Sequence, residues 1–176
     1  MSAYDQRWVR SSPEGYRLAN GSAVLCHACG ARDSCFVRRG ADYLMESRGI
    51  ELSVAVCPEF LPVITFDDDT GLDATFNTFR RGPGWFRRLK IDTRVRFYSK
   101  ELETFVGSGR VVEAHCAPLS EMLERHASFN HLLRDGNYAD ADARLQAILV
   151  RLYGRNYAKP DVEYSVIYIE PQPVGV

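Results

Sequence analysis

Alternation of hydrophobic and polar residues predicts that most of the chain after its first third consists of short β-strands. Such runs place every second side chain on the same face of a sheet, and turn-forming residues separate one run from the next. Gly107 and Gly109 interrupt the longest run, which indicates a bulge or a bend there. The predicted strands are residues 50–56, 61–66, 74–79, 93–99 and 104–114.

Helical spacing dominates only late in the chain. Apolar residues recur three and four positions apart in the stretch that begins at Leu119 and again over residues 138–153, where Gly154 has the position of a C-cap. A single helical turn is expected at residues 85–89, and residues 162–169 return to a strand pattern. Strands followed by helices predict an α+β fold over residues 59–176, namely a small β-barrel with two to three packed helices.

Four of the five cysteines lie between residues 26 and 57. Four thiolates satisfy the tetrahedral preference of zinc, and a closed four-cysteine set is typical of a structural site. We therefore expect residues 1–58 to form a small zinc-binding module, with buried free thiols or a disulfide pair as the alternatives. The predicted ligands are Cys26, Cys29, Cys35 and Cys57.

The N-terminus lacks the pattern of a secretory signal, and no apolar run reaches the roughly 20 residues that a membrane-spanning helix needs. Together with the odd number of cysteines, this predicts a cytoplasmic protein in a reducing compartment, without a membrane partner. The sequence shows no phosphate-loop, serine-hydrolase or zinc-protease motif, which argues against those enzyme classes.

The net charge of −1 hides a strongly basic stretch between residues 80 and 96, where seven basic residues face only one acidic residue, Asp92. Guanidinium groups pair with phosphates, and aromatic rings stack on bases. A solvated turn with Phe79 and Phe86 packed beneath it is the alternative. The residues predicted to bind nucleic acid here are Asn77, Thr78, Arg80, Arg81, Trp85, Arg87, Arg88 and Lys90.

Three pieces of the chain, in order, carry a resemblance to the ASCH domain of the PUA-like superfamily. These are residues 75–80 with the glycine turn and Trp-Phe pair that follow, residues 119–127 with their His-Ala ending, and residues 145–153 with the strand 164–170. Residues 61–170 thus resemble this family. The resemblance implies a PUA-like barrel that binds RNA or a nucleotide, including the recognition of a modified base.

The chain departs from the family where a branch of it hydrolyses acylated cytidine. Thr75 stands where that branch has lysine, and Asn130 stands where it has glutamate. Without those groups, Thr78 has no evident base to activate it. Thr78 and His126 are the remaining catalytic candidates, although His126 lies on an apolar helical face with His131 nearby, which favours a core histidine.

Two other functions stay open at this point. The chain could be a hydrolase, acting on acylated nucleosides or as a ribonuclease. It could instead be a protein-interaction factor, phage-encoded, whose charge pattern serves a protein partner.

Overall fold

The structure is a computed structural model, and it describes two short N-terminal strands, a few residues of the cysteine-rich region and nearly all of the chain from Phe60 on. The predicted strand at residues 50–56 and the cysteines Cys26 and Cys57 lie outside the described residues, as do residues 134–138. The described residues are 8–12, 15–18, 29, 35, 39, 43, 46–48, 60–133 and 139–173.

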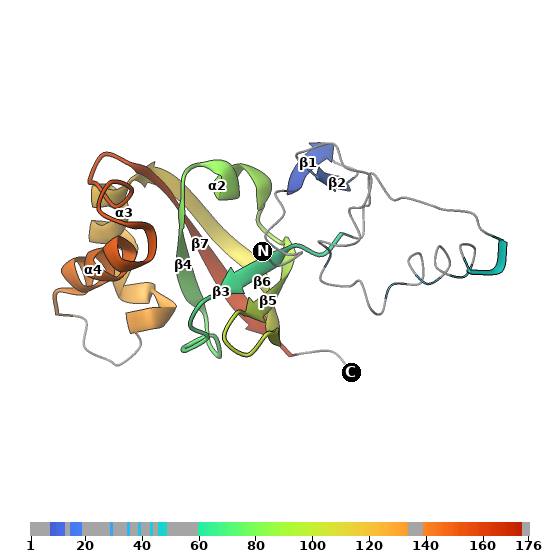
Figure 1. The fold of residues 1–176 in the computed structure, drawn as a ribbon. Helices are drawn as coiled ribbons and strands as arrows, with labels where there is room; N and C mark the ends of the chain where they lie inside the picture. Colours follow the sequence, from blue (N-terminus) through green and yellow to red (C-terminus); the bar gives the residue numbers. More distant parts are fainter. Residues whose placement is uncertain are drawn as a thin grey trace.

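A five-stranded mixed sheet forms the centre of the described chain, with strand order β3-β5-β6-β7-β4 (Figure 1). β3 runs parallel to β5, whereas the remaining neighbours are antiparallel. The strands are β3 (Val63–Phe66), β4 (Phe76–Arg81), β5 (Arg94–Ser99), β6 (Thr104–Pro118) and β7 (Glu163–Gln172).

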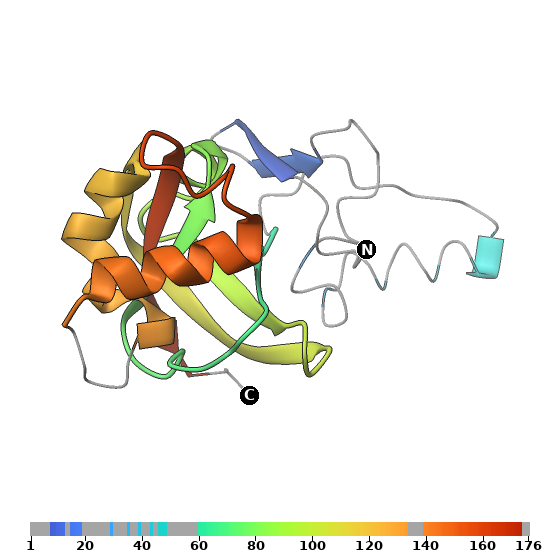
Figure 2. The same ribbon diagram turned by 60° about the vertical axis from the view of Figure 1, so that its left-hand side comes forward.

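The helices lie where the sequence predicts them. α2 (Gly84–Arg88) follows β4 directly, and α3 (Leu119–His126) and α4 (Ala141–Tyr153) lie between β6 and β7 in the sequence. Figures 1 and 2 show α3 and α4 together on one face of the sheet. Two short 3-10 turns, Ala127–Phe129 and His131–Leu133, continue α3. The predicted α+β class and the order of the later elements are confirmed.

The two-residue period of β7 divides the apolar side chains into two cores. Ile167 and Ile169 belong to the core on the concave side of the sheet, with Phe76 and Phe97. Tyr164 and other alternate residues of β7 belong to the second core, which α3 and α4 cover. The second core contains Phe79, Leu119, Met122, Leu123, Leu145, Leu149, Tyr164 and Val166.

Side chains connect the two edges of the curved sheet. In the described chain β3 and β4 have no backbone pairing with each other. Arg80 on β4 nevertheless donates from Nη2 to the carbonyl oxygen of Thr65 on β3 at 2.8 Å. The rings of Phe66 and Phe76 also meet across this gap, with centroids 6.0 Å apart. The predicted barrel is therefore a curved, open sheet, and the gap between its edges is filled by side chains.

The glycine-rich part of β6 contains the irregularity that the sequence predicts. The pairing of β5 with β6 shifts register between Phe97 and Tyr98, beside Gly107. Gly109 lies against its neighbours so closely that an added Cβ would stand 2.6 Å from Ile169 Cγ2. The glycine at 109 thus allows β6 to approach β7 and the ring of Phe97.

At the N-terminus, β1 (Trp8–Ser12) pairs antiparallel with β2 (Gly15–Leu18). The two strands flank the Pro13–Glu14 pair, a turn signal in the sequence, but the strands themselves were not predicted because they are short and mixed in polarity. Among the described residues, no helix is long and apolar enough to cross a membrane.

Candidate functional site

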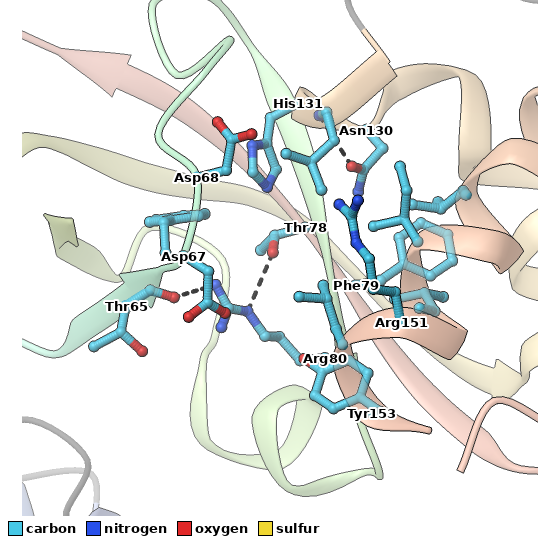
Figure 3. Close-up of a pocket in the computed structure, with 16 residues that line it drawn as sticks. Thr65, Asp67, Asp68, Thr78, Phe79, Arg80, Asn130, His131, Arg151 and Tyr153 are labelled. Atoms are coloured by element: carbon cyan, nitrogen blue, oxygen red, sulfur yellow. Dashed lines mark hydrogen bonds between the residues drawn. The ribbon is translucent and has the colours of Figure 1, made fainter. Parts of the chain in front are cut away.

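A pocket of about 210 Å³ opens beside Thr78 and Arg80, at the free edge of β4 (Figure 3). The segment after β3 forms one wall, α4 forms the opposite wall, and the 3-10 turn at His131–Leu133 closes one end. Its polar lining consists of Thr65, Asp67, Asp68, Thr78, Arg80, Asn130, His131, Arg151 and Tyr153.

Arg80 is the central charged group of this pocket. Its Nε donates to Thr78 Oγ1 at 3.1 Å, and its Nη2 donates to the Thr65 carbonyl oxygen. The guanidinium also lies over the rings of Phe66 and Trp85, at 5.0 and 5.5 Å from their centroids. Its position is therefore fixed on several sides, while the described residues offer no hydrogen-bond partner to Nη1.

The charge of Arg80 has no carboxylate within ion-pair distance in the described part of the chain. Asp67 acts on the charge of Arg80 electrostatically, but its carboxylate pairs with Lys100 at 3.0 Å; both Asp67 and Arg80 are labelled in Figure 3. Burial lowers the pKa of the Arg80 guanidinium, and Tyr153 and Asp67 offset part of that effect. Because an arginine stays protonated in proteins, Arg80 keeps its charge without forming an ion pair in the described part of the chain, although Asp67 and Asp68 also line the pocket.

Thr78 lies in the pocket, but nothing activates it for nucleophilic attack. It is buried, and its hydroxyl oxygen accepts the Arg80 Nε hydrogen. No carboxylate or imidazole of the described chain forms a hydrogen bond with this hydroxyl. A cationic donor makes the oxygen a weaker nucleophile, so this geometry favours binding over acyl transfer.

Asn77 faces the opposite side of β4 from Thr78, because successive strand residues alternate. Its Nδ2 donates to the His126 carbonyl oxygen at 2.7 Å. Asn130 Nδ2 in turn donates to the Asn77 carbonyl oxygen at 3.3 Å, and Asn130 Oδ1 accepts from the Leu132 backbone N–H at 3.1 Å. Asn77 thus holds the pocket-closing turn in place through Asn130 and is no part of the pocket itself.

The rim of the pocket contains further ionisable groups that sequence reasoning did not assign to a site. His131 Nδ1 donates to the Thr70 carbonyl oxygen at 3.0 Å, and its ring packs edge-on against Phe66. Hydrogen bonds from Thr70, and the nearby His131 and Arg151, lower the pKa of the Asp68 carboxyl. These residues come from three separate elements, and no local motif joins them in the sequence.

The predicted residues of α2 form a second cluster, outside the pocket. The guanidiniums of Arg80 and Arg88 both lie over the Trp85 ring, and Arg88 Nε donates to the Gly84 carbonyl oxygen. Trp85 packs against the concave core, whereas Phe86 is 38% exposed. Arg87 and Lys90 are exposed. The alternative interpretation of this stretch was a solvated turn with Phe79 and Phe86 packed beneath it. Phe79 is indeed buried, whereas Phe86 is not.

His126 belongs to a chain of polar contacts on the helical side of the sheet. Its Nδ1 lies 2.9 Å from Tyr168 Oη, and its ring stacks on that of His115 with centroids 4.5 Å apart. His115 Nε2 contacts Glu113 Oε1 at 2.6 Å. These contacts fit the prediction that His126 is a core histidine with satisfied hydrogen bonds, although the residue is only half-buried.

His126 makes stability depend on pH. Burial, then the neighbouring His115, lowers the pKa of His126 below its ordinary 6.5. The unfolded chain therefore takes up this proton at a higher pH than the folded protein, and stability should fall as the pH drops below about 6.5. We expect His126→Gln to flatten this dependence, measured as the free energy of unfolding in urea at several pH values.

The control for that experiment is Tyr168→Phe, which removes the hydroxyl but keeps the imidazole. The pH dependence should survive in this variant. An equal dependence in the wild type and in His126→Gln would contradict the assignment to His126.

Of the predicted zinc ligands, the structure describes Cys29 and Cys35. Cys29 is 7% exposed and packs in the concave core near Phe60, and its Sγ accepts the Leu61 backbone N–H at 3.3 Å. Cys35 is half-buried. The described residues alone contain no group of three or more metal-ligating side chains. Zinc binding therefore stays a prediction.

Comparison with known proteins gives one similarity. No family model and no curated protein matches the chain. Among solved structures, the chain is similar to ZmASCH of Zymomonas mobilis, known from a crystal structure of a point mutant, with 10% identity and a TM-score of 0.39. The match covers 65% of this chain and 74% of that one. Values this low neither assign the chain to that protein's family nor transfer any of its residues.

Proposed function

We propose that this chain is an ASCH-type, PUA-like protein that binds RNA or a nucleotide, and that a base enters the pocket beside Thr78 and Arg80. The carrying observation is the Arg80 guanidinium. It lies in a pocket, has no carboxylate partner among the described residues, and keeps unused N–H donors at Nη1. A half-buried charge without an ion-pair partner costs stability, which a ligand with acceptor atoms would offset.

The size of the pocket supports a base as the bound group. Sites for drug-sized ligands have volumes of roughly 300–1,000 Å³. A cavity of about 210 Å³ therefore suits one base, with its ribose and phosphate outside. Arg80 would donate to base acceptors such as ring nitrogens or carbonyl oxygens, as arginine does in base recognition. Recognition of a modified base is the finer form of this proposal.

The chemistry of the pocket favours a binding protein over a hydrolase. The ASCH hydrolase branch that the sequence resembles uses a lysine and a glutamate, and this chain has Thr75 and Asn130 in their places. Asn130 lines the pocket, but its amide group is occupied with Asn77 and Leu132. An amide cannot act as a general acid or base at neutral pH.

The function is tested by titrating the protein with nucleoside monophosphates and with single-stranded RNA. Log affinity for RNA should fall linearly with log salt concentration, by about 0.7 per phosphate contacted. Exchanging Arg87 and Arg88 together for methionine should flatten that slope if α2 contributes phosphate contacts. An unchanged slope would exclude α2 from the interface, and a protein that binds neither ligand contradicts the proposal.

We also propose a structural zinc ion held by Cys26, Cys29, Cys35 and Cys57. The support is the ligand set itself and the backbone N–H that points at Cys29 Sγ, since such bonds stabilise a thiolate. Purified protein should contain one equivalent of zinc by elemental analysis, and a chelator should lower its melting temperature. Cys116→Ser is the matched control and should keep the metal. Protein without zinc and insensitive to the chelator would contradict the site.

A further inference from the structure

We propose that single-stranded RNA leaves the pocket across the C-terminal end of α4, where Arg81, Arg151, Arg155 and Tyr157 form its contact surface. This surface, called the α4 platform below, is additional to the residues predicted on α2. The inference rests on the proposed function, because it assumes that the group in the pocket is a base of a longer strand.

Arg81 and Tyr157 form the stacked part of the α4 platform. The Arg81 guanidinium lies over the Tyr157 ring at 4.2 Å from its centroid. The Tyr157 side chain is 50% exposed, and Arg81 is exposed as well. Bases of single-stranded RNA stack on aromatic rings and on guanidinium planes, and this pair presents both at the surface.

The backbone holds Tyr157 firmly despite its exposure. The N–H groups of Tyr157 and Ala158 both donate to the Gly154 carbonyl oxygen, at 3.1 and 3.2 Å. The Tyr164 hydroxyl donates to the Tyr157 carbonyl oxygen at 3.1 Å, and Ala158 is buried. Gly154 makes this tight turn possible, because its φ of 85° suits glycine. A platform fixed in this way loses little conformational entropy when a base stacks on it.

The same two elements, β4 and α4, contribute residues both to the pocket and to the α4 platform. Tyr153 lines the pocket, and its ring lies 6.1 Å from that of Tyr164, the residue that holds the Tyr157 turn. Arg81 follows Arg80 in β4 and pairs in register with Tyr164, with its side chain on the opposite face of the strand from that of Arg80. The proposed path therefore passes over the edge of β4, from the base beside Arg80 to a neighbouring nucleotide over Arg81 and Tyr157.

The charge of the α4 platform suits a phosphate backbone. Arg81, Arg151 and Arg155 are exposed, and none forms an ion pair within the described part of the chain. By contrast, Arg110 pairs with two carboxylates and Arg125 pairs with Glu121. Exposed arginines without carboxylate partners attract a polyanion. A single strand fits better than a duplex, because only an unpaired base can enter the pocket.

The experiment compares the affinities of a mononucleotide and a single-stranded RNA oligonucleotide for the wild type and for variants. In Arg81→Met/Arg155→Met, we expect the salt slope for the oligonucleotide to decrease by about 1.4, which corresponds to two lost phosphate contacts. Tyr157→Ala should weaken oligonucleotide binding at least about fivefold through lost stacking. Mononucleotide affinity should stay unchanged in both variants.

Arg94→Met, an exposed arginine on β5, is the control for general loss of charge, and melting temperatures verify that each variant is folded. The inference is overturned if Arg94→Met lowers the salt slope for the oligonucleotide by as much per removed charge as Arg81→Met/Arg155→Met does. It is also overturned if the platform variants bind the oligonucleotide as tightly as the wild type does. If Arg80→Met strongly weakens binding while the platform variants do not, the pocket stands and only the α4 platform fails. If the wild type binds neither ligand, the proposed function itself fails.

Discussion

Exchanging Arg80 for methionine should strongly weaken nucleotide binding while leaving the protein folded. Methionine keeps most of the apolar contact with Phe66 and Trp85 but removes the charge and the N–H donors that Arg80 presents in the pocket. Loss of hydrogen bonds from a charged group typically costs about 1.5–3 kcal/mol of binding free energy, so we expect affinity to fall at least about 10-fold. Isothermal titration with nucleoside monophosphates measures this.

Stability separates this functional effect from a structural one. Arg80→Met loses the bonds to Thr65 and Thr78 but also removes a charge whose burial is unfavourable. We therefore expect the free energy of unfolding to change by less than about 1 kcal/mol. Arg80→Lys should retain part of the affinity, because lysine keeps the charge but lacks the guanidinium fork. A variant with wild-type affinity would remove Arg80 from the binding site.

Gly109→Ala should destabilise the sheet more than any other glycine-to-alanine exchange considered for the described chain. The new Cβ would lie 2.6 Å from Ile169 Cγ2, 2.8 Å from the Glu170 carbonyl oxygen and 2.8 Å from Phe97 Cζ. Because one of these atoms belongs to the backbone, side-chain movement cannot relieve the overlap. We expect a loss of about 2–3 kcal/mol in the free energy of unfolding, measured by urea denaturation.

Two other glycines provide matched controls. At Gly84 the nearest atom to an added Cβ is the flexible end of Arg88, at 3.7 Å, so Gly84→Ala should be neutral or slightly stabilising. Gly107→Ala meets only the Phe97 ring below 3 Å and should have an intermediate effect. Equal losses at Gly84 and Gly109 would contradict the close approach of β6 to β7.

The sequence predicted most elements of the sheet and helices because their patterns are local. The helical spacing in residues 138–153 corresponds to α4, and the glycines of the 104–114 run correspond to the register shift in β6. The terminal hairpin was missed, since Trp8–Ser12 and Gly15–Leu18 are too short to show a clear period. Whether the sheet closes into a barrel depends on pairing between its two edge strands, β3 and β4. The hydrophobic pattern within each single strand does not show whether such pairing forms.

The candidate site was predictable only in part. Thr78 and Arg80 are two residues apart on one strand, so their shared face follows from the strand period. The same period places Asn77 on the other face, where it supports Asn130 instead of lining the pocket. Tyr153 and Arg151 reach the pocket from α4, more than 70 residues later in the chain, and only the tertiary fold brings them there.

Trp85 shows that the local composition of the sequence does not reveal which aromatic rings are free to stack on a base. An aromatic ring among arginines suggests stacking on a base, but here two guanidiniums, those of Arg80 and Arg88, lie over a ring that is half-buried, whereas the half-exposed ring of Tyr157 has only Arg81 over it among the described residues. The comparable ring with an exposed surface is Tyr157, which lies outside the basic stretch in sequence. Its partner Arg81 does belong to that stretch. Of the four residues of the α4 platform, the sequence therefore predicted only Arg81.

The most direct measurement is a crystal structure of the full chain bound to a short single-stranded RNA. The account predicts electron density for one unstacked base in the pocket, with base acceptor atoms within hydrogen-bond distance of the Arg80 guanidinium. RNA bound elsewhere on the protein, with the pocket beside Thr78 and Arg80 holding no base, would contradict it.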